Sequence, residues 1–454
     1  MLKDELRSIS PLDGRYSKRL QALEERFSEY ALIKSRLKVE IEWLIFLSNQ
    51  KSISFIKPLS KKNITALRDL IENFSLKDAK EIKKIESTSN HDVKAVELFI
   101  TKKLTSLKLN RYNEFVHLFC TSEDINNLSY NLMIKDYLES EFKEIIIELR
   151  QDIKRKAKKW ANYAMLSHTH GQTASPTTMG KELANFYSRI DFHFHLINKF
   201  KPSGKINGAV GNYNAHYLID SKINWTVFSK RFVNSLGLDW TKYSTQIELK
   251  DNLATMISYQ ENLNNVLIDF SQDIWLYISK GYIKQLTKDK EVGSSTMPHK
   301  VNPIDFENAE GNLKLSNSLL ISIKEKIQIS RMQRDLSDST TLRNLGSALS
   351  YSYLAITSLI KGLSKIQANR EKLSEDLESN WEVLTEAIQT ILRKNNVENS
   401  YEKIKKLSRG KSFDKNSYLA IIAALDISEE DKTKLSNLTP LKYIGLAEKL
   451  AKEI

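Results

Sequence analysis

The sixteen residues LNNVLIDFSQDIWLYI, at positions 263–278, show the pattern that decides the fold. Their apolar side chains recur at steps of three and four, which places them on one face of an α-helix. The stripe consists of Leu263, Val266, Leu267, Phe270, Ile274 and Ile278. Because a helix with one apolar face must bury that face against other elements, this stretch predicts a helix bundle.

Glycine and proline are scarce in the whole chain. The 14 glycines and 7 prolines make up under 5% of the 454 residues, whereas an average chain has about 12%. Residues 59–170 contain neither residue type, and the same holds for 15–57, 238–280, 312–345 and 363–409. Since little interrupts these stretches, we expect an all-α protein with several long helices.

Length and composition limit the class of protein. The chain is long enough for about three domains, and it has no apolar run near the ~18 residues of a membrane span. The N-terminus carries Asp4 and Glu5 and lacks the apolar segment of a secretory signal. Cys120 is the single cysteine, which fits a reducing compartment. We expect a soluble cytoplasmic protein with no membrane partner.

The formal net charge of +13 raises the question of a polyanionic partner. Only residues 154–159 form a dense basic run, and on a helix their side chains point all round the axis. This pattern favours a solvated helix over a nucleic-acid surface, so we expect no nucleic-acid partner.

The few helix breakers gather in two stretches, 171–211 and 293–311. The second contains GSSTMPHKVNP at 293–303, where backbone N–H groups could form an anion-binding concavity beside Lys300 and Asn302. There the hydroxyl of Ser294 or Ser295 could be held as an alkoxide and act as a base or nucleophile. The composition of residues 293–303, taken alone, fits an ordinary polar connector better than a catalytic loop.

The first stretch opens within the loop SHTHGQTASP at 167–176. His168 and His170 could form a metal pair, but no cysteine is near and no carboxylate lies at ligand spacing, so we expect no metal. A histidine that acts as an acid or base near neutral pH fits better. Ser175 as N-cap and Pro176 at the first helical position predict that a helix begins here.

Two further segments combine hydroxyl groups and charge where a helix would begin. Thr121 to Asp124 and Ser89 to Asp92 both have the spacing of a capping box. Capping explains each segment, and the alternative is that their hydroxyl and N–H groups hold a substrate carboxylate or phosphate. Some arginines carry guanidinium groups that could bind such an anion or form surface ion pairs. They are Arg15, Arg331, Arg334 and Arg343.

With these residues in view, the chain resembles the fumarase/aspartase superfamily. The superfamily signature Gly-Ser-Ser-x-Met-Pro-x-Lys-x-Asn-Pro is complete at 293–303, and His299 at its second variable position is typical of the long bacterial adenylosuccinate lyases. Thr173 departs from the proline common in that family and affects no catalytic group. Supporting matches lie at 10–16, 90–97, 121–124, 205–208, 439–440 and 443–445.

The resemblance implies an all-α fold of three helical domains. These are an N-terminal domain at 1–112, a central long-helix bundle with the catalytic loops at 113–364, and a C-terminal domain at 365–454. It also implies a homotetramer whose active sites are shared between subunits. The implied reactions eliminate fumarate from adenylosuccinate, giving AMP, and from the succinylated aminoimidazole carboxamide ribotide (SAICAR), giving AICAR, with neither cofactor nor metal.

The resemblance also assigns roles to single residues. Ser294 is the implied base and His170 the implied acid, while Lys300 and Asn302 hold the carboxylate on which charge develops. The implied substrate-binding residues are Asn90, His91, Asp92, Thr121 and Ser122, with Gln246 and Asn308 near the succinyl group and Arg15, Tyr16, Arg334, Ser339 and Arg343 near the phosphate.

Three alternatives stay open at this point. A related lyase acting on argininosuccinate, malate or aspartate would keep Ser294 and His170 but needs no phosphate site. A basic helical nucleic-acid binder would lose affinity steeply with salt. A helical scaffold protein would tolerate the loss of Ser294.

Overall fold

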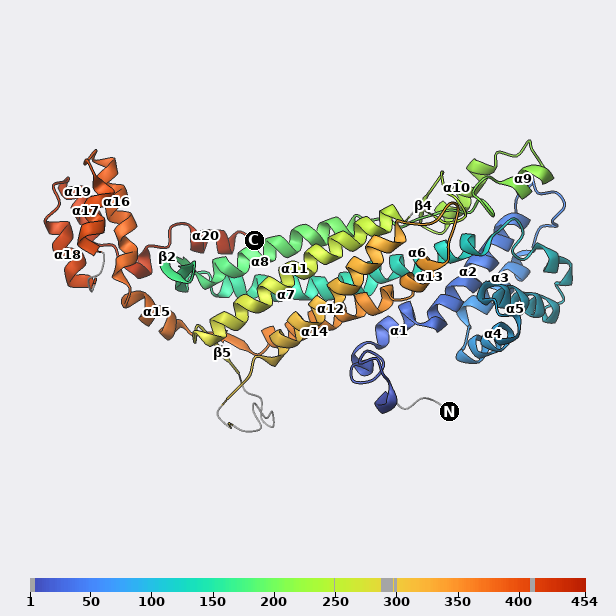
Figure 1. Ribbon diagram of the computed structural model, residues 1–454, viewed down its shortest axis with the longest axis horizontal. Coiled ribbons are helices and arrows are strands. Elements are labelled where there is room, and N and C mark those ends of the chain that lie inside the picture. The colour runs from blue at the N-terminus through green and yellow to red at the C-terminus, as the bar shows by residue number, and fades with distance from the viewer. Residues whose placement is uncertain (1–4, 249, 287–296, 298–299, 409–412) are drawn as a thin grey trace. The chain divides into compact units, whose positions relative to one another are not determined.

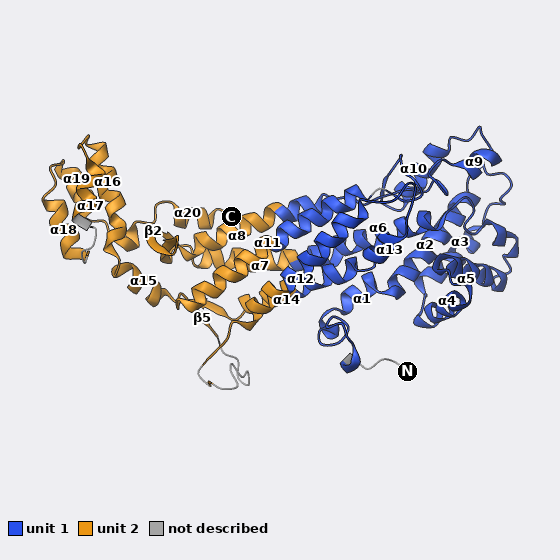
Figure 2. Ribbon diagram, viewed as in Figure 1, with its two compact units in different colours: residues 1–145, 193–264, 312–354 blue, residues 146–192, 265–311, 355–454 orange. Residues whose placement is uncertain are grey.

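The computed structural model describes residues 5–248, 250–286, 297, 300–408 and 413–454 (Figure 1). Helices dominate it, so the predicted all-α class is confirmed. The chain divides into two compact units (Figure 2): unit 1 contains residues 1–145, 193–264 and 312–354, and unit 2 contains 146–192, 265–311 and 355–454. The expected three domains, with boundaries at 112/113 and 364/365, stay a prediction.

The helices are assigned to the units as follows. Unit 1 contains α1 (Gln21–Phe27), α2 (Glu29–Ser48), α3 (Lys61–Glu72), α4 (Leu76–Ser89), α5 (Asp92–Ser106), α6 (Ser122–Tyr137), α9 (Asn214–Ile219), α10 (Trp225–Ser235) and α13 (Ser337–Leu342). Unit 2 contains α15 (Arg370–Glu378), α16 (Thr385–Lys394), α17 (Ser400–Ser408), α18 (Lys415–Ala423), α19 (Glu429–Ser436) and α20 (Ala447–Lys452). Five helices are divided between the two units: α7 (Lys143–Lys159), α8 (Met179–Asn198), α11 (Asp251–Ser279), α12 (Ile304–Ile327) and α14 (Leu345–Leu363).

Short helical turns and strands complete the described chain. The turns are η1 (Glu5–Arg7), η2 (Ser17–Arg19), η3 (Asn110–Phe115), the π-helical η4 (Leu138–Phe142), η5 (Trp381–Leu384) and η6 (Pro440–Lys442). The strands form three two-stranded sheets: β1 (Ala164–Thr169) antiparallel to β2 (Gln172–Thr178), β3 (Ser203–Gly204) parallel to β4 (Asp239–Trp240), and β5 (Ile283–Gln285) antiparallel to β6 (Ile366–Ala368).

The hairpin of β1 and β2 corrects one prediction. A helix does not begin at Ser175, because the chain stays extended to Thr178 and pairs with β1, for example Ala174 with Ser167. Helix α8 begins at Met179 instead, where the Lys181 N–H donates to Oγ1 of Thr178 at 3.1 Å. Ladder pairing across the hairpin therefore outweighs the local helix-start signal.

The apolar stripe on α11 is buried as predicted. Five of its six side chains are 5% exposed or less, and Ile278 is half-buried. Removing each such side chain from water contributes about 1.5–3 kcal/mol. In unit 2, Phe270 on α11 meets Phe186 on α8 edge to face, with ring centroids 5.2 Å apart. The periodicity thus identified the packed face correctly.

A buried polar layer joins three helices of the bundle within unit 1. The Ser352 hydroxyl on α14 donates to Oδ1 of Asn264 on α11 at 2.7 Å, and the Asn264 amide donates to Ser316 on α12 at 3.1 Å. The Ser316 hydroxyl then donates to the Ala348 carbonyl at 2.8 Å. Because an unpaired buried polar group is costly, this layer fixes the register of the helices.

Within the described ranges, no helix combines the length and the apolar composition needed to cross a bilayer.

His216 on α9 is the most isolated buried histidine of unit 1. Its side chain is fully buried and stacks on Phe119, with ring centroids 4.6 Å apart, and neither ring nitrogen has a hydrogen-bond partner among the described residues. Burial lowers the pKa of His216 to about 4, and the charge of Asp124 offsets only part of this effect. The imidazole is therefore neutral at pH 7 and must gain a charge when acid unfolds the chain.

We predict that His216→Phe makes the protein less sensitive to acid. The folded-state pKa lies below 6.5, so the stability contributed by neutral His216 is complete above pH 6.5 and is lost as the pH falls toward 4. Between pH 7 and pH 4.5 the free energy of unfolding should fall by roughly 2–3 kcal/mol more in wild type than in the variant. Urea unfolding measures this difference, with the exposed His195→Phe as control. Equal pH dependence of wild type and His216→Phe would contradict the assignment.

Candidate active site

A cavity of about 670 Å³ lies in unit 1. Its lining comes from α2, the α4–α5 junction, the start of α6, the segment before α11, and the segment around α13. The predicted site residues that line it are Asn90, His91, Asp92, Ser122, Gln246, Arg334, Ser339 and Arg343. Eight expected substrate-binding residues, distant in sequence, are thus brought together in one cavity.

The α4–α5 junction presents His91 to the cavity. Asn90 ends α4 in the left-handed conformation, with φ 51°, and α5 begins two residues later at Asp92. The predicted cap at Ser89 is wrong, because Ser89 is the last residue of α4 and His91 is the N-cap of α5. Nδ1 of His91 accepts the Lys94 N–H at 3.2 Å, so this bond directs the ring proton of a neutral His91 to Nε2.

The start of α6 is held by a buried carboxylate. Asp124 accepts the N–H of Thr121 at 2.9 Å, as the capping-box spacing predicts, and also the N–H groups of Asn207 and Gly208 at 3.0 Å. The ammonium of Lys205 lies 2.8 Å from the same carboxylate, and both side chains are fully buried. These contacts orient the first turn of α6, where Ser122 lines the cavity and Thr121 does not.

Arginines and a carboxylate form one wall of the cavity. Asp92 lies 2.7 Å from Arg36 and 3.2 Å from Arg343, and Arg343 also pairs with Glu29 at 3.0 Å. Burial raises the pKa of Asp92, but the charge of Arg36 and the hydrogen bond from the Val93 N–H outweigh burial and lower it below the usual range. Asp92 is therefore ionised and directs two guanidinium groups.

Arg334 and Gln246 form a second wall. The Arg334 guanidinium donates to Oε1 of Gln246 at 3.2 Å and lies 3.6 Å from a carboxylate oxygen of Glu123. The backbone N–H of Gln246 donates to the Gln333 carbonyl at 3.3 Å, which joins the segment before α11 to the segment before α13. The lining thus carries three arginines and two serine hydroxyls beside five carboxylates. Because Arg36 is buried in its pair with Asp92, Arg334 and Arg343 are the guanidinium groups that could receive an anionic ligand.

Other predicted residues lie elsewhere in the chain. In unit 1, Arg15 is exposed and Tyr16 is half-buried just before η2, and neither lines the cavity. Unit 2 contains His170, Lys300, Asn302 and Asn308. Ser294 and Ser295 lie outside the described residues, as does His299.

The unit 2 residues have distinct local settings. His170 is exposed at the turn between β1 and β2, with φ 53°. Lys300 and Asn302 precede α12, and the Lys300 N–H donates to the Met297 carbonyl at 3.0 Å. Asn308 on α12 accepts the Ser358 hydroxyl at 2.8 Å.

Sequence reasoning missed several residues of the cavity, above all Arg36. Its side chain is 2% exposed, pairs with Asp92, and donates to Asn126 at 2.8 Å. No clear signal for Arg36 was available in the sequence, because Lys34 and Lys38 flank it and a local pattern does not show which of these cations is buried and must find a partner. The other lining residues missed are Glu86, Glu123, Asn126, Tyr130, Asp335, Leu336, Asp338, Thr340 and Leu342.

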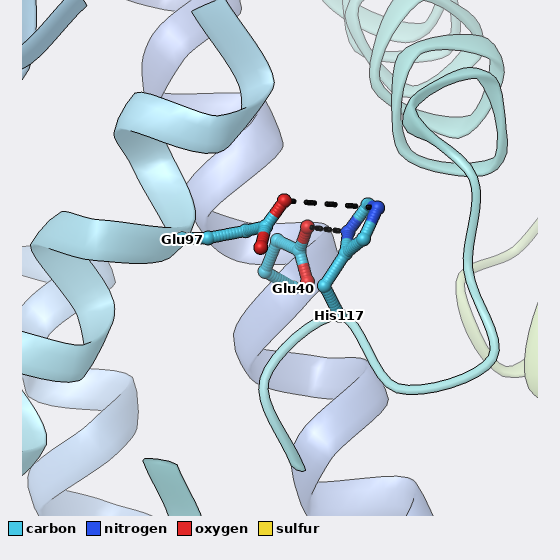
Figure 3. A group of neighbouring side chains, drawn as sticks. All are labelled: Glu40, Glu97 and His117. Atoms are coloured by element: carbon cyan, nitrogen blue, oxygen red, sulfur yellow. Dashed lines mark hydrogen bonds and ion pairs between the residues drawn. The ribbon is translucent and has the colours of Figure 1, made fainter. Parts of the chain in front are cut away.

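Glu40, Glu97 and His117 form a separate cluster in unit 1 (Figure 3). Nδ1 of His117 lies 2.6 Å from Glu40 and Nε2 lies 3.8 Å from Glu97, and a divalent metal could use this donor set. However, Lys94 already pairs with Glu97 at 2.8 Å. Burial lowers the pKa of His117, but the hydrogen bond and charge of Glu40 raise it more. The geometry favours an imidazolium between two carboxylates over a metal centre.

Comparisons with known proteins identify the family of the chain. Residues 14–316 match the lyase family model, and residues 330–444 match the adenylosuccinate lyase C-terminal model. The chain is 50% identical over 448 residues to adenylosuccinate lyase of Legionella pneumophila strain Corby, covering 98% of each chain. It is 47% and 46% identical over 450 residues to those of Buchnera aphidicola from Acyrthosiphon pisum and Escherichia coli K12, covering 99% of each chain.

Solved structures show the same fold at low sequence identity. A fumarate lyase from Mesorhizobium sp. BNC1 superposes with a TM-score of 0.76 at 16% identity, covering 95% of this chain and 97% of that one. The 3-carboxy-cis,cis-muconate lactonizing enzyme of Pseudomonas putida gives 0.74 at 18% identity, covering 95% and 96%. These likenesses define the class as the all-α fumarase/aspartase fold.

The full-length matches go further than the fold. The chain belongs to the adenylosuccinate lyase family. It is accordingly an enzyme, a carbon–nitrogen lyase.

We predict that Asp92→Asn destabilises the protein because it leaves buried Arg36 without its counter-charge. Breaking a buried pair costs on the order of 3 kcal/mol, so the urea midpoint should fall clearly. The matched control is Asp152→Asn, which removes a carboxylate 2.6 Å from Arg155, a residue whose side chain is 71% exposed. The control should lose less than about 1 kcal/mol. Equal losses in both variants would show that Arg36 does not depend on Asp92.

Proposed function

We propose that the protein eliminates fumarate from adenylosuccinate to give AMP, and from SAICAR to give AICAR, in purine biosynthesis. The observation that carries this proposal is the unit 1 cavity, which gathers eight expected substrate-binding residues from four stretches of chain. Identity of 46–50% to curated adenylosuccinate lyases over nearly the whole chain supports it.

The cavity's cations fit the charge of these substrates, which carry a phosphate and two carboxylates. We propose that Arg334 and Arg343 bind the phosphate, since a guanidinium fork matches its oxygens. The hydroxyls of Ser122 and Ser339 lie on the same lining and can donate further hydrogen bonds. Gln246 and His91 then contact the remaining polar groups of the substrate.

The elimination needs a base, an acid and a clamp for developing charge. In our proposal Ser294 removes the proton from the carbon next to a carboxylate, and Lys300 with Asn302 stabilises the charge that accumulates on that carboxylate. The carbon–nitrogen bond then breaks while His170 protonates the leaving nitrogen, which releases fumarate. Proton transfer and charge stabilisation account for every step, so the proposal includes no cofactor or metal.

We further propose a cytoplasmic homotetramer in which each active site draws residues from more than one chain. In this arrangement His170 and Ser294 of one site come from different subunits. The resemblance of the motif at 293–303 to the superfamily signature supports this assembly, and a single cysteine fits a reducing compartment.

We predict that Ser294→Ala and His170→Ala each lower turnover at least ~10²-fold, the usual scale for a positioned acid or base. Fumarate release from adenylosuccinate, followed by absorbance, measures this. Ser295→Ala and His168→Ala are the neighbouring controls. When the two inactive variants are unfolded, mixed one to one and refolded, a shared site should recover roughly a quarter of wild-type activity.

The outcomes separate the parts of this proposal. Near wild-type turnover in Ser294→Ala would contradict the base assignment and point to Ser295. No recovery in the mixture, despite proven subunit exchange, would place both groups on one chain. Sizing of the wild-type protein tests the tetramer independently.

We predict that Arg334→Lys and Arg343→Lys raise KM more than they lower kcat, because a remote phosphate is bound about equally in the ground and transition states. Dephosphorylated adenylosuccinate should be a poor substrate for wild type and lose little more in the variants. The control is Arg331→Lys, whose side chain is 84% exposed. Variants that still discriminate against the dephosphorylated substrate as strongly as wild type would exclude these arginines as the phosphate site.

A further inference from the structure

A buried cation without an assigned role lies behind the cavity wall. The ammonium of Lys250 is 3.2 Å from Oδ2 of Asp338 and 3.4 Å from Oε1 of Glu123. All three side chains are at most 4% exposed. Lys250 does not line the cavity, whereas both carboxylate residues do.

The two carboxylates belong to the turns that present the serine hydroxyls. Glu123 follows Ser122 in the first turn of α6, and Asp338 precedes Ser339 in α13. One ammonium therefore connects two walls of the cavity that are more than 200 residues apart in sequence. A shift of either carboxylate would move its serine neighbour as well.

Charge balance explains why a cation is needed at this point. Oδ1 of Asp338 has no hydrogen-bond partner in the described chain, and Lys250 is its ion-pair partner there. Glu123 has a second, longer contact with Arg334 at 3.6 Å. Without Lys250, two buried carboxylates would share one guanidinium beside a cavity that must admit an anion.

The surroundings keep Lys250 charged. Burial lowers its pKa, but the charges of Glu123, Asp338 and Glu248 outweigh burial and raise it above the usual value. Glu248 accepts hydroxyl hydrogen bonds from Ser203 and Thr241, and burial raises its pKa to about 7. Lys250 is thus an ammonium throughout the physiological pH range.

We propose that Lys250 is a positioning residue of the lyase reaction. It neutralises Glu123 and Asp338 and ties the Ser122 and Ser339 turns together, so that the cavity accepts the anionic part of the substrate. This inference rests on the proposed function in one respect, namely that the substrate phosphate binds in the unit 1 cavity.

The test replaces Lys250 by methionine, which has a similar length and no charge. We expect Lys250→Met to raise KM for adenylosuccinate about tenfold while kcat changes less, because uncompensated carboxylates repel the anion. KM for the dephosphorylated substrate should rise less. Adding Asp338→Asn to this variant should return KM most of the way to the wild-type value. The double variant lacks the positive charge of Lys250 and also one of the two negative charges that it neutralised. Lys250→Arg should stay closer to wild type than Lys250→Met.

The matched control is Lys324→Met, which breaks a partly buried pair with Glu261 at 2.7 Å in the same unit. It should lower stability without changing KM. If Lys250→Met does not fold, Lys250→Gln carries the same expectation, since it also removes the charge while its polar amide is easier to accommodate beside two carboxylates.

The results separate this inference from the proposed function. A folded Lys250→Met or Lys250→Gln variant with wild-type KM would overturn the positioning role, and so would an equal rise in KM for both substrates. Wild-type protein that releases no fumarate from adenylosuccinate would instead overturn the proposed function, before any variant is compared.

Discussion

The carboxylate of Asp124 is the contact on which the cavity depends most. It is fully buried, accepts three backbone N–H groups, and pairs with buried Lys205. A carboxylate in this position is stable only if every lone pair and its charge are satisfied, so its partners fix two chain segments at once. The start of α6 and the segment 205–208 are therefore held together before any substrate binds.

The same rule governs the rest of the cavity. Each charged group that the structure places deep in the wall has an opposite charge within 4 Å, such as Asp92 with Arg36 and Asp338 with Lys250. Burying a charge is costly unless it is paired, so these pairs are fixed in place and leave few charges free to respond to a ligand. Arg343 is paired as well, with Glu29 and Asp92, but 45% of its side chain is accessible. The paired charges of the wall are therefore preorganised before any ligand binds.

Local sequence patterns predicted some turns correctly and others not. The capping box at Thr121 formed because Asp124 lies three residues on and can reach the Thr121 N–H. The same spacing at Ser89 failed because α4 continues through Ser89, and His91 caps α5 instead. Ser175 and Pro176 have the composition of a helix start, yet hairpin pairing with β1 keeps them extended. At Ser175, pairing with a neighbouring strand outweighed a signal of a few residues, and at Ser89 the continuing helix did so.

The sequence by itself determined the all-α class, the buried stripe on α11 and the family, because helix periodicity and an eleven-residue motif are properties of neighbours along the chain. It also supplied eight residues that line the cavity, through their resemblance to a known family. Only the tertiary structure decided that Arg36, Glu123 and Asp338 belong with them and that Lys250 lies behind them. Charge pairing acts over a few ångströms between segments that lie from about 50 to more than 100 residues apart, as in the pairs of Arg36 with Asp92 and of Lys250 with Glu123. No local pattern encodes which buried cation meets which carboxylate.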